Sequence, residues 1–145
     1  MKKIAFFFLI VIVIVVFISY LYLNYRINYN QIKQENNYFE SYLDKEIYGT
    51  ELTTIINKAI DKNTQNNIEK DNKGFYIDNK INSINIDVKM LDNDKIYKME
   101  TFFNGKMKNF VQYYGDVKFK CQRIEYHKNT EKIRYIFFEQ MKDLN

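Results

Sequence analysis

The stretch IAFFFLIVIVIVVFISYLYL occupies residues 4–23 and contains twenty residues without one charged side chain. As an α-helix that rises about 1.5 Å per residue, it would cover roughly 30 Å, which matches the hydrocarbon thickness of a bilayer. Tyr20, Tyr22 and Tyr25 lie near its far end, where aromatic side chains typically meet the headgroup region. The stretch therefore predicts a transmembrane helix over residues 4–23, through which the chain binds the lipid bilayer.

A secretory signal peptide is the alternative interpretation of this stretch. The apolar region of such a peptide is normally about 7–15 residues long and is followed by small residues at the cleavage site. Here Ser19 is the only small residue between Val16 and Arg26, and no Ala-x-Ala pattern occurs. A lipoprotein is excluded because the only cysteine is Cys121. We therefore expect an uncleaved signal anchor.

The basic residues that flank the span predict its orientation. Lys2 and Lys3 precede it, whereas Arg26 and Lys33 follow it, and the cytoplasmic side of a membrane helix carries the excess of Lys and Arg. We expect residues 1–3 in the cytoplasm, a single-pass location in the cell membrane, and the rest of the chain outside. One unpaired cysteine fits an exported domain that does not depend on disulfides.

After the apolar stretch, mainly apolar side chains recur at alternating spacings of four and three residues. They are Tyr25, Tyr29, Ile32, Asn36, Phe39 and Leu43. No Pro or Gly precedes Gly49, so the pattern predicts a membrane-proximal helix over residues 24–47 that ends near Glu46. These six residues form a candidate self-association seam, in which Asn36 would set the register of a short coiled coil. They could instead pack on the protein's own sheet, which the aromatic residues and the shortness of the pattern favour.

Residues 48–145 are predicted to form one extracytoplasmic α+β domain. A second helix is expected at about 50–62, with Thr50 as its N-cap. Its apolar residues follow the i, i+3, i+4, i+7, i+8 spacing of an amphipathic helix. They are Leu52, Ile55, Ile56, Ala59 and Ile60.

A period of two replaces the helical period after Gly74 and predicts a small antiparallel sheet of four to five strands. The expected strands cover residues 75–78, 83–91, 95–103, 117–126 and 132–140. A β-bulge near Gln122 and Arg123 would explain a shift in the apolar phase. The last strand should be central, because residues 135–138 are continuously apolar. One short helix, at about 105–114 with Asn104 as its cap, is inserted before the fourth strand.

The composition argues against nucleic-acid binding and against treating the many tyrosines as evidence of a binding site. Two of the 22 basic residues precede the span, which leaves 20 against 18 acidic residues and a net charge of +2 beyond it. That charge is too small for a nucleic-acid-binding surface. The chain has 13 Tyr and 12 Phe but no Pro and no Trp. Codons rich in A and T explain this usage and indicate a low-GC bacterium, so the tyrosines alone do not predict a binding site.

The residues that could carry chemistry form no recognisable motif. Cys121, Glu125 and His127 suggest a nucleophile and a base, but Cys121 occupies an alternating apolar position and is expected in the core. His127 is the only histidine, and the pair Asp92 and Asp94 lacks the other positions of a calcium loop. No phosphate-binding glycine loop, Gly-x-Ser-x-Gly or His-Glu-x-x-His motif occurs. We therefore expect no catalytic residues, no metal and no cofactor.

The predicted order of elements resembles type IV pilins and pseudopilins, in which a membrane helix continues into an amphipathic helix and a small antiparallel sheet follows. That family carries a Gly-Phe processing site and a Glu five residues into the mature helix. Here Lys3 is followed directly by Ile4, and no Gly or acidic residue precedes Glu35. The resemblance is one of architecture, without the processing motif.

Three functions remain open from the sequence. The first is a non-catalytic interaction or assembly component of the cell envelope, with a protein partner or a second copy of the chain. The second is a membrane-tethered ligand-binding or sensing module, which a pocket between the second helix and the sheet would favour. An enzyme is the third and least favoured.

Overall fold

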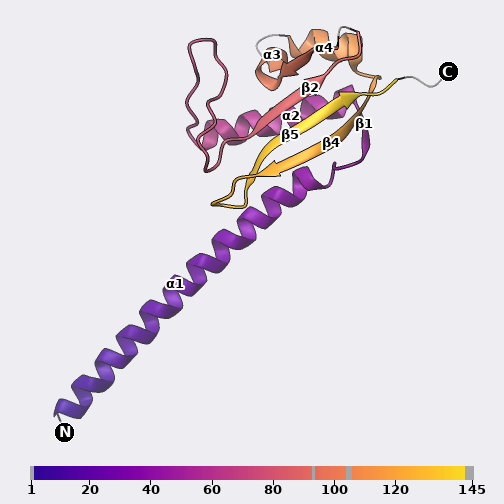
Figure 1. Cartoon of the computed structure of the whole chain (residues 1–145). Helices are drawn as coiled ribbons and strands as arrows, with labels where there is room; N and C mark the ends of the chain where they lie inside the picture. Colours follow the sequence, from indigo (N-terminus) through magenta and orange to yellow (C-terminus); the bar gives the residue numbers. More distant parts are fainter. Residues whose placement is uncertain (1, 93, 104–105, 143–145) are drawn as a thin grey trace. The chain divides into compact units, whose positions relative to one another are not determined.

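The computed structural model describes residues 2–92, 94–103 and 106–142. The elements in these ranges are α1 (Lys2–Glu40), β1 (Glu46–Tyr48), α2 (Gly49–Gln65), β2 (Asn85–Lys89), β3 (Ile96–Lys98), α3 (Met99–Phe103), α4 (Met107–Tyr114), β4 (Lys118–Tyr126) and β5 (Ile133–Gln140) (Figure 1). The chain forms two compact units, whose boundary lies between Glu35 and Asn36 within α1. This arrangement confirms the α+β class predicted from the sequence.

The first unit is the apolar part of α1. Its helix is long and apolar enough to cross a membrane. The side chains from Ile4 to Leu23 are exposed, whereas the core helix of a globular domain would have most of its apolar side chains covered. The first unit is therefore compatible with a membrane anchor.

The helix ends at Glu40, earlier than the end near Glu46 that the sequence pattern predicted. The chain turns there, and Asp44 takes a left-handed backbone conformation with φ 60°. The N–H of Asp44 then donates to the carbonyl of Cys121 at 3.0 Å. Pairing with β4 thus takes the main chain out of the helix, and residues 46–48 become the edge strand β1.

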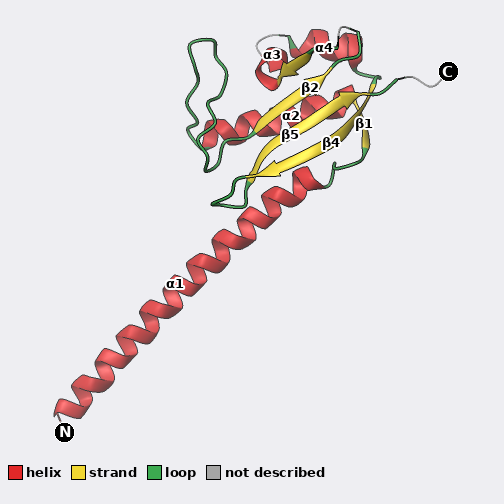
Figure 2. Ribbon diagram, viewed as in Figure 1, coloured by secondary structure: helices red, strands yellow, loops and turns green. Residues whose placement is uncertain are grey.

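The second unit contains a five-stranded sheet in the order β1-β4-β5-β2-β3 (Figure 2). Neighbouring strands are antiparallel except β2 and β5, which are parallel. The central position predicted for the last strand is confirmed, because β5 lies between β4 and β2. The predicted bulge is also confirmed, since the β4–β5 register shifts between Cys121 and Arg123.

Two predicted strands differ from the structure. Residues 75–78 form only an isolated bridge, between Lys70 and Tyr76. The strand expected over residues 95–103 ends at Lys98, and the chain continues as the short helix α3. Met99 and Phe102 are both buried, three residues apart, which is helical spacing rather than the period of two assumed for a strand. The predicted cap Asn104 lies outside the described residues.

Helix α2 begins at Gly49, with Tyr48 rather than Thr50 in the N-cap position and no side-chain cap. The N–H groups of Gly49 and Thr50 donate instead to the carbonyls of Val117 and Gly115, at 2.9 and 3.1 Å. These bonds satisfy donors that a capping side chain would otherwise serve. The main chain approaches so closely here that a Cβ on residue 49 would collide with the Tyr114 carbonyl.

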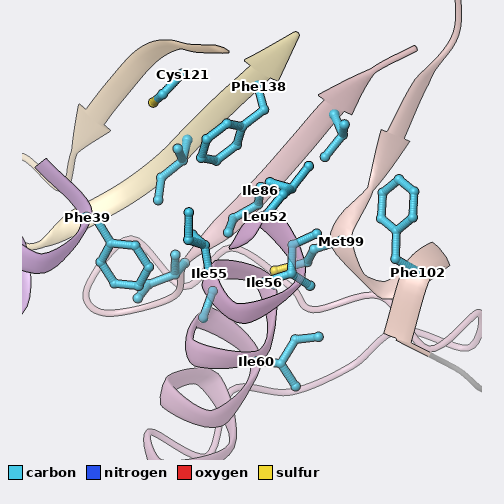
Figure 3. Close-up of a cluster of buried hydrophobic side chains, with 14 of the residues drawn as sticks. Phe39, Leu52, Ile55, Ile56, Ile60, Ile86, Met99, Phe102, Cys121 and Phe138 are labelled. Atoms are coloured by element: carbon cyan, nitrogen blue, oxygen red, sulfur yellow. The ribbon is translucent and has the colours of Figure 1, made fainter. Parts of the chain in front are cut away.

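The core lies between α2 and the sheet (Figure 3). The side chains of Leu52, Ile55 and Ile56 are fully buried, as the amphipathic pattern predicted. They meet Ile86 of β2 and Phe138 of β5, both also buried. Because apolar side chains fill this space, the gap between the second helix and the sheet is a packed core.

Candidate functional site

The candidate self-association seam is divided between the two units. Asn36, Phe39 and Leu43 belong to the second unit, and Phe39 is only 3% exposed, within the core. The side-chain amide of Asn36 donates to the carbonyl of Glu131 at 2.7 Å, and its oxygen accepts from the N–H of Ile133 at 3.1 Å. Asn36 and Phe39 therefore hold the end of α1 in the domain. Leu43 lies beyond the helix.

The other three seam residues, Tyr25, Tyr29 and Ile32, lie in the first unit. The rings of Tyr25 and Tyr29 stack on each other, with centroids 6.5 Å apart and planes 20° apart. Both tyrosines are exposed, with 70% and 49% of their surface accessible. Self-association through this part of α1 stays a prediction.

Cys121 is fully buried, as the sequence predicted for a core residue. Burial raises the pKa of its thiol to about 11, so the nucleophilic thiolate is disfavoured. Glu125 forms ion pairs with Arg123 at 3.3 Å and with Arg134 at 3.4 Å. His127 is 3% exposed, and its Nε2 lies 2.8 Å from the carbonyl oxygen of Ser83. Cys121 is thus a core residue, and Glu125 and His127 have separate partners.

The acidic pair near residue 93 also has separate partners. An oxygen of Asp92 accepts a hydrogen bond from the Tyr114 hydroxyl at 2.9 Å, and Asp94 pairs with Lys89 at 3.1 Å. Asn93, the middle residue of the predicted turn, lies outside the described residues. Within the described ranges, no three His, Cys, Asp or Glu side chains are grouped so that they could hold a metal ion.

The face of the sheet away from α2 carries charged side chains that pair with one another. The Arg123 guanidinium lies over the rings of Tyr135 and Phe137, 5.3 and 5.9 Å from their centroids. The Tyr135 hydroxyl donates to Asp87 at 3.0 Å, and Lys89 forms a 3.0 Å ion pair with Glu139. These pairs leave this face without a strong charge of one sign.

A different region of the second unit is hollowed. A cavity of about 370 Å³ lies where the end of β2 and β3 meet α3 and α4. We call it the aromatic cleft, because five of its lining residues are aromatic: Tyr97, Phe102, Phe110, Tyr113 and Tyr114. Its volume lies in the range of small-molecule sites, about 300–1,000 Å³.

The rings of the aromatic cleft pack against one another. Phe102 and Phe110 are buried and meet edge to face, with centroids 4.8 Å apart. Tyr114 stacks on Phe110 at 5.4 Å, and Tyr97 lies 6.1 Å from Phe102. Tyr113 is 72% exposed. The cleft therefore has a fixed aromatic floor and an accessible aromatic rim.

Polar groups from two helices and two loop positions also line the aromatic cleft. They are Asp92, Thr101, Lys106 and Asn109. The hydrogen bond to Asp92, together with burial, raises the pKa of the Tyr114 hydroxyl above its usual value. Because Tyr114 donates to one oxygen of Asp92, the carboxylate is oriented relative to the rings. A cleft with aromatic walls and a few polar groups is typical of ligand-binding sites.

Two further cavities formed by described residues are less aromatic. One of about 230 Å³ lies beside Glu100, whose buried carboxylate accepts a hydrogen bond from the Tyr76 N–H at 2.8 Å. Another of about 350 Å³ lies by the β4–β5 turn, with Arg134 and Asp78 in its lining. That arginine donates to that aspartate at 2.7 Å. The ionised groups named here are thus already bonded within the fold.

The fold and the site define a class: a small α+β domain that follows a long apolar N-terminal helix and carries an aromatic cleft. No family model matches the chain, and no curated protein and no solved structure matches it either.

Proposed function

We propose that this chain is a single-pass membrane protein whose second unit stands outside the cytoplasm and acts as a non-catalytic interaction or assembly component of the cell envelope. The observation that carries the proposal is the apolar helix over residues 4–23, whose side chains are exposed. Exposed apolar side chains over about 30 Å of helix need a hydrocarbon environment. The bilayer supplies that environment.

The charge bias supports the direction of the anchor. Two lysines precede the apolar stretch, and the next basic residues are Arg26 and Lys33. The uncharged stretch continues to Tyr25, which fits an anchor that stays in the chain better than a short apolar region followed by a cleavage site.

A non-catalytic role is supported by the burial of the two side chains most suited to catalysis, Cys121 and His127. Cys121 is in the core with a raised pKa, and His127 bonds to the main chain of Ser83. A general base must reach a substrate proton, whereas Cys121 and His127 are only 0% and 3% exposed. A second function, ligand binding or sensing, is favoured by the aromatic cleft.

Cysteine labelling in intact cells tests the topology. The buried Cys121 gives little background, so one cysteine is introduced at Gln65, which is exposed on the second unit. This substitution leaves the flanking basic residues unchanged. A membrane-impermeant maleimide should label Gln65→Cys in intact cells. Labelling of Gln65→Cys only after the cells are lysed would show the opposite orientation.

The mass of the purified membrane form tests the uncleaved anchor. A chain that keeps the anchor has a mass of 17.7 kDa. A mature chain that lacks residues 1–23 would show that the apolar stretch is a signal peptide, and the proposal of a permanent tether would fail.

A further inference from the structure

We propose that the aromatic cleft binds a neutral sugar ring of an envelope glycan. The inference deepens the proposed function, because it gives the domain's partner at the envelope a chemical class. It rests on the cavity, on its aromatic side chains and on the balance of charge around it.

The aromatic side chains suit the faces of a sugar ring. A pyranose presents C–H groups on its faces, and these carry a small positive charge that matches the negative face of an aromatic ring. Tyr113 and Tyr97 line the cleft together with the buried rings of Phe102 and Phe110. The exposed ring of Tyr113 can stack on a ligand without displacing core side chains.

The polar side chains suit the hydroxyl groups at the edge of a sugar ring. Asp92 accepts hydrogen bonds, Asn109 both donates and accepts, and Thr101 carries a hydroxyl. Tyr114 donates to Oδ2 of Asp92 and thereby orients the other oxygen, Oδ1, as an acceptor. The aromatic walls can contact the apolar faces of such a ligand, and the short polar groups beside them can form hydrogen bonds with its polar edge.

The charges around the aromatic cleft favour a neutral ligand. Asp92 and Lys106 both line it, one acidic and one basic. A cation over the aromatic rings would be attracted by Asp92 but repelled by Lys106, and an anion would meet the reverse. For a ligand with a net charge, the attraction by one of these side chains is offset by the repulsion from the other. For a neutral ligand, both side chains can still form hydrogen bonds with hydroxyl groups.

Calorimetric titration of the full chain tests the proposal. The chain is held in a polyoxyethylene detergent, because detergents with sugar or choline headgroups would compete for the cleft. Two neutral probes, maltotriose and tri-N-acetylchitotriose, are compared with choline and glucuronate. We expect at least one neutral probe to bind, and choline and glucuronate to give no heat.

Four variants locate the binding. Tyr113→Ala should weaken the binding of the neutral sugar about tenfold, because it removes a stacking ring. Tyr113→Phe keeps the ring and should bind like the wild type. Asp92→Asn keeps the acceptor for Tyr114 and should weaken sugar binding less than Tyr113→Ala. Tyr48→Ala removes an exposed tyrosine on the edge strand β1 and should leave binding unchanged.

Several outcomes would overturn the assignment. No binding of either neutral probe at concentrations on the order of 10 mM is one. Choline binding that disappears in Asp92→Asn would identify a cation site, and glucuronate binding that disappears in Lys106→Gln an anion site. An equal loss in Tyr48→Ala would place the binding elsewhere. Each of these outcomes is independent of the maleimide labelling, so a failed ligand class and a failed topology are distinguished.

Discussion

The carboxamide of Asn63 exchanges two hydrogen bonds with the main chain of Ile84. Its oxygen accepts from the Ile84 N–H at 2.8 Å, and its nitrogen donates to the Ile84 carbonyl at 2.7 Å. Asn63 is fully buried near the end of α2, and Ile84 directly precedes β2. The side-chain amide thus pairs with Ile84 as a neighbouring strand would. This pairing fixes the start of β2 relative to α2.

Asn63→Ala is expected to lower the free energy of unfolding by about 3 kcal/mol, because it leaves a buried N–H and a buried carbonyl without partners. Urea unfolding of the full chain in detergent micelles, followed by circular dichroism, measures the change. Gln65→Ala removes an exposed amide from the same helix and should change stability by less than about 0.5 kcal/mol. Equal effects of the two substitutions would contradict the role given to Asn63.

Asn36→Leu separates the two interpretations of the candidate seam. If Asn36 holds the β4–β5 turn, the variant loses its bonds to Glu131 and Ile133, and the domain should be destabilised by about 1–2 kcal/mol. A coiled-coil seam predicts the opposite, since leucine at such a position strengthens association. Urea unfolding and chemical cross-linking are measured on the same sample. A rise in cross-linked dimer with undiminished stability would favour the seam.

Cys121 is expected to resist alkylation in the folded protein. Burial raises the pKa of its thiol to about 11, and no part of the side chain is accessible. At about pH 8 iodoacetamide should therefore react with Cys121 only after urea unfolds the domain. The variant Gln65→Cys gives an exposed thiol on the same chain, which should react at once. A native Cys121 that reacted as fast as this control would contradict the burial.

The domain should lose stability in alkaline solution. Burial raises the pKa of Tyr126 from 10.0 to about 12, with a further contribution from Glu40, whose carboxylate accepts the tyrosine's hydrogen bond at 2.9 Å. Between pH 10 and about 12 the unfolded tyrosine releases its proton while the folded one keeps it, so unfolding becomes more favourable as the pH rises.

Tyr126→Phe has no proton to release and should show a shallower alkaline decline in the free energy of unfolding. A decline will remain, because burial also raises the pKa of Tyr135 to about 12. Urea unfolding at a series of pH values compares the two slopes. Identical slopes would show that Tyr126 does not contribute.

The elements with strong periodicity could be predicted from the sequence. The apolar face of α2 and the alternation of Ile84, Ile86 and Val88 each depend on one face being buried, and such a face leaves a clear pattern. The bulge beside Cys121 was also visible in the sequence, as a shift in the alternation of apolar residues. The end of α1 left no such signal, because the pairing of residues 43–48 with β4 is a contact between distant segments.

The aromatic cleft was missed for a different reason. Codon usage explained the many tyrosines, so they carried no information about a site. The concentration of Tyr97, Phe102, Phe110, Tyr113 and Tyr114 within 18 residues was a signal that could have been used. The switch from strand to helix at Met99 brings these rings together, and the alternation assumed for residues 95–103 concealed that switch.

The central position of β5 also decides whether the sheet is continuous. Among the described strands, β5 is the one that joins the pair β1–β4 to the pair β2–β3. Without residues 133–140 the described strands would form two separate pairs, β1–β4 and β2–β3. The antiparallel pairing of β5 with β4 and its parallel pairing with β2 therefore make one continuous sheet out of two hairpin-sized pieces.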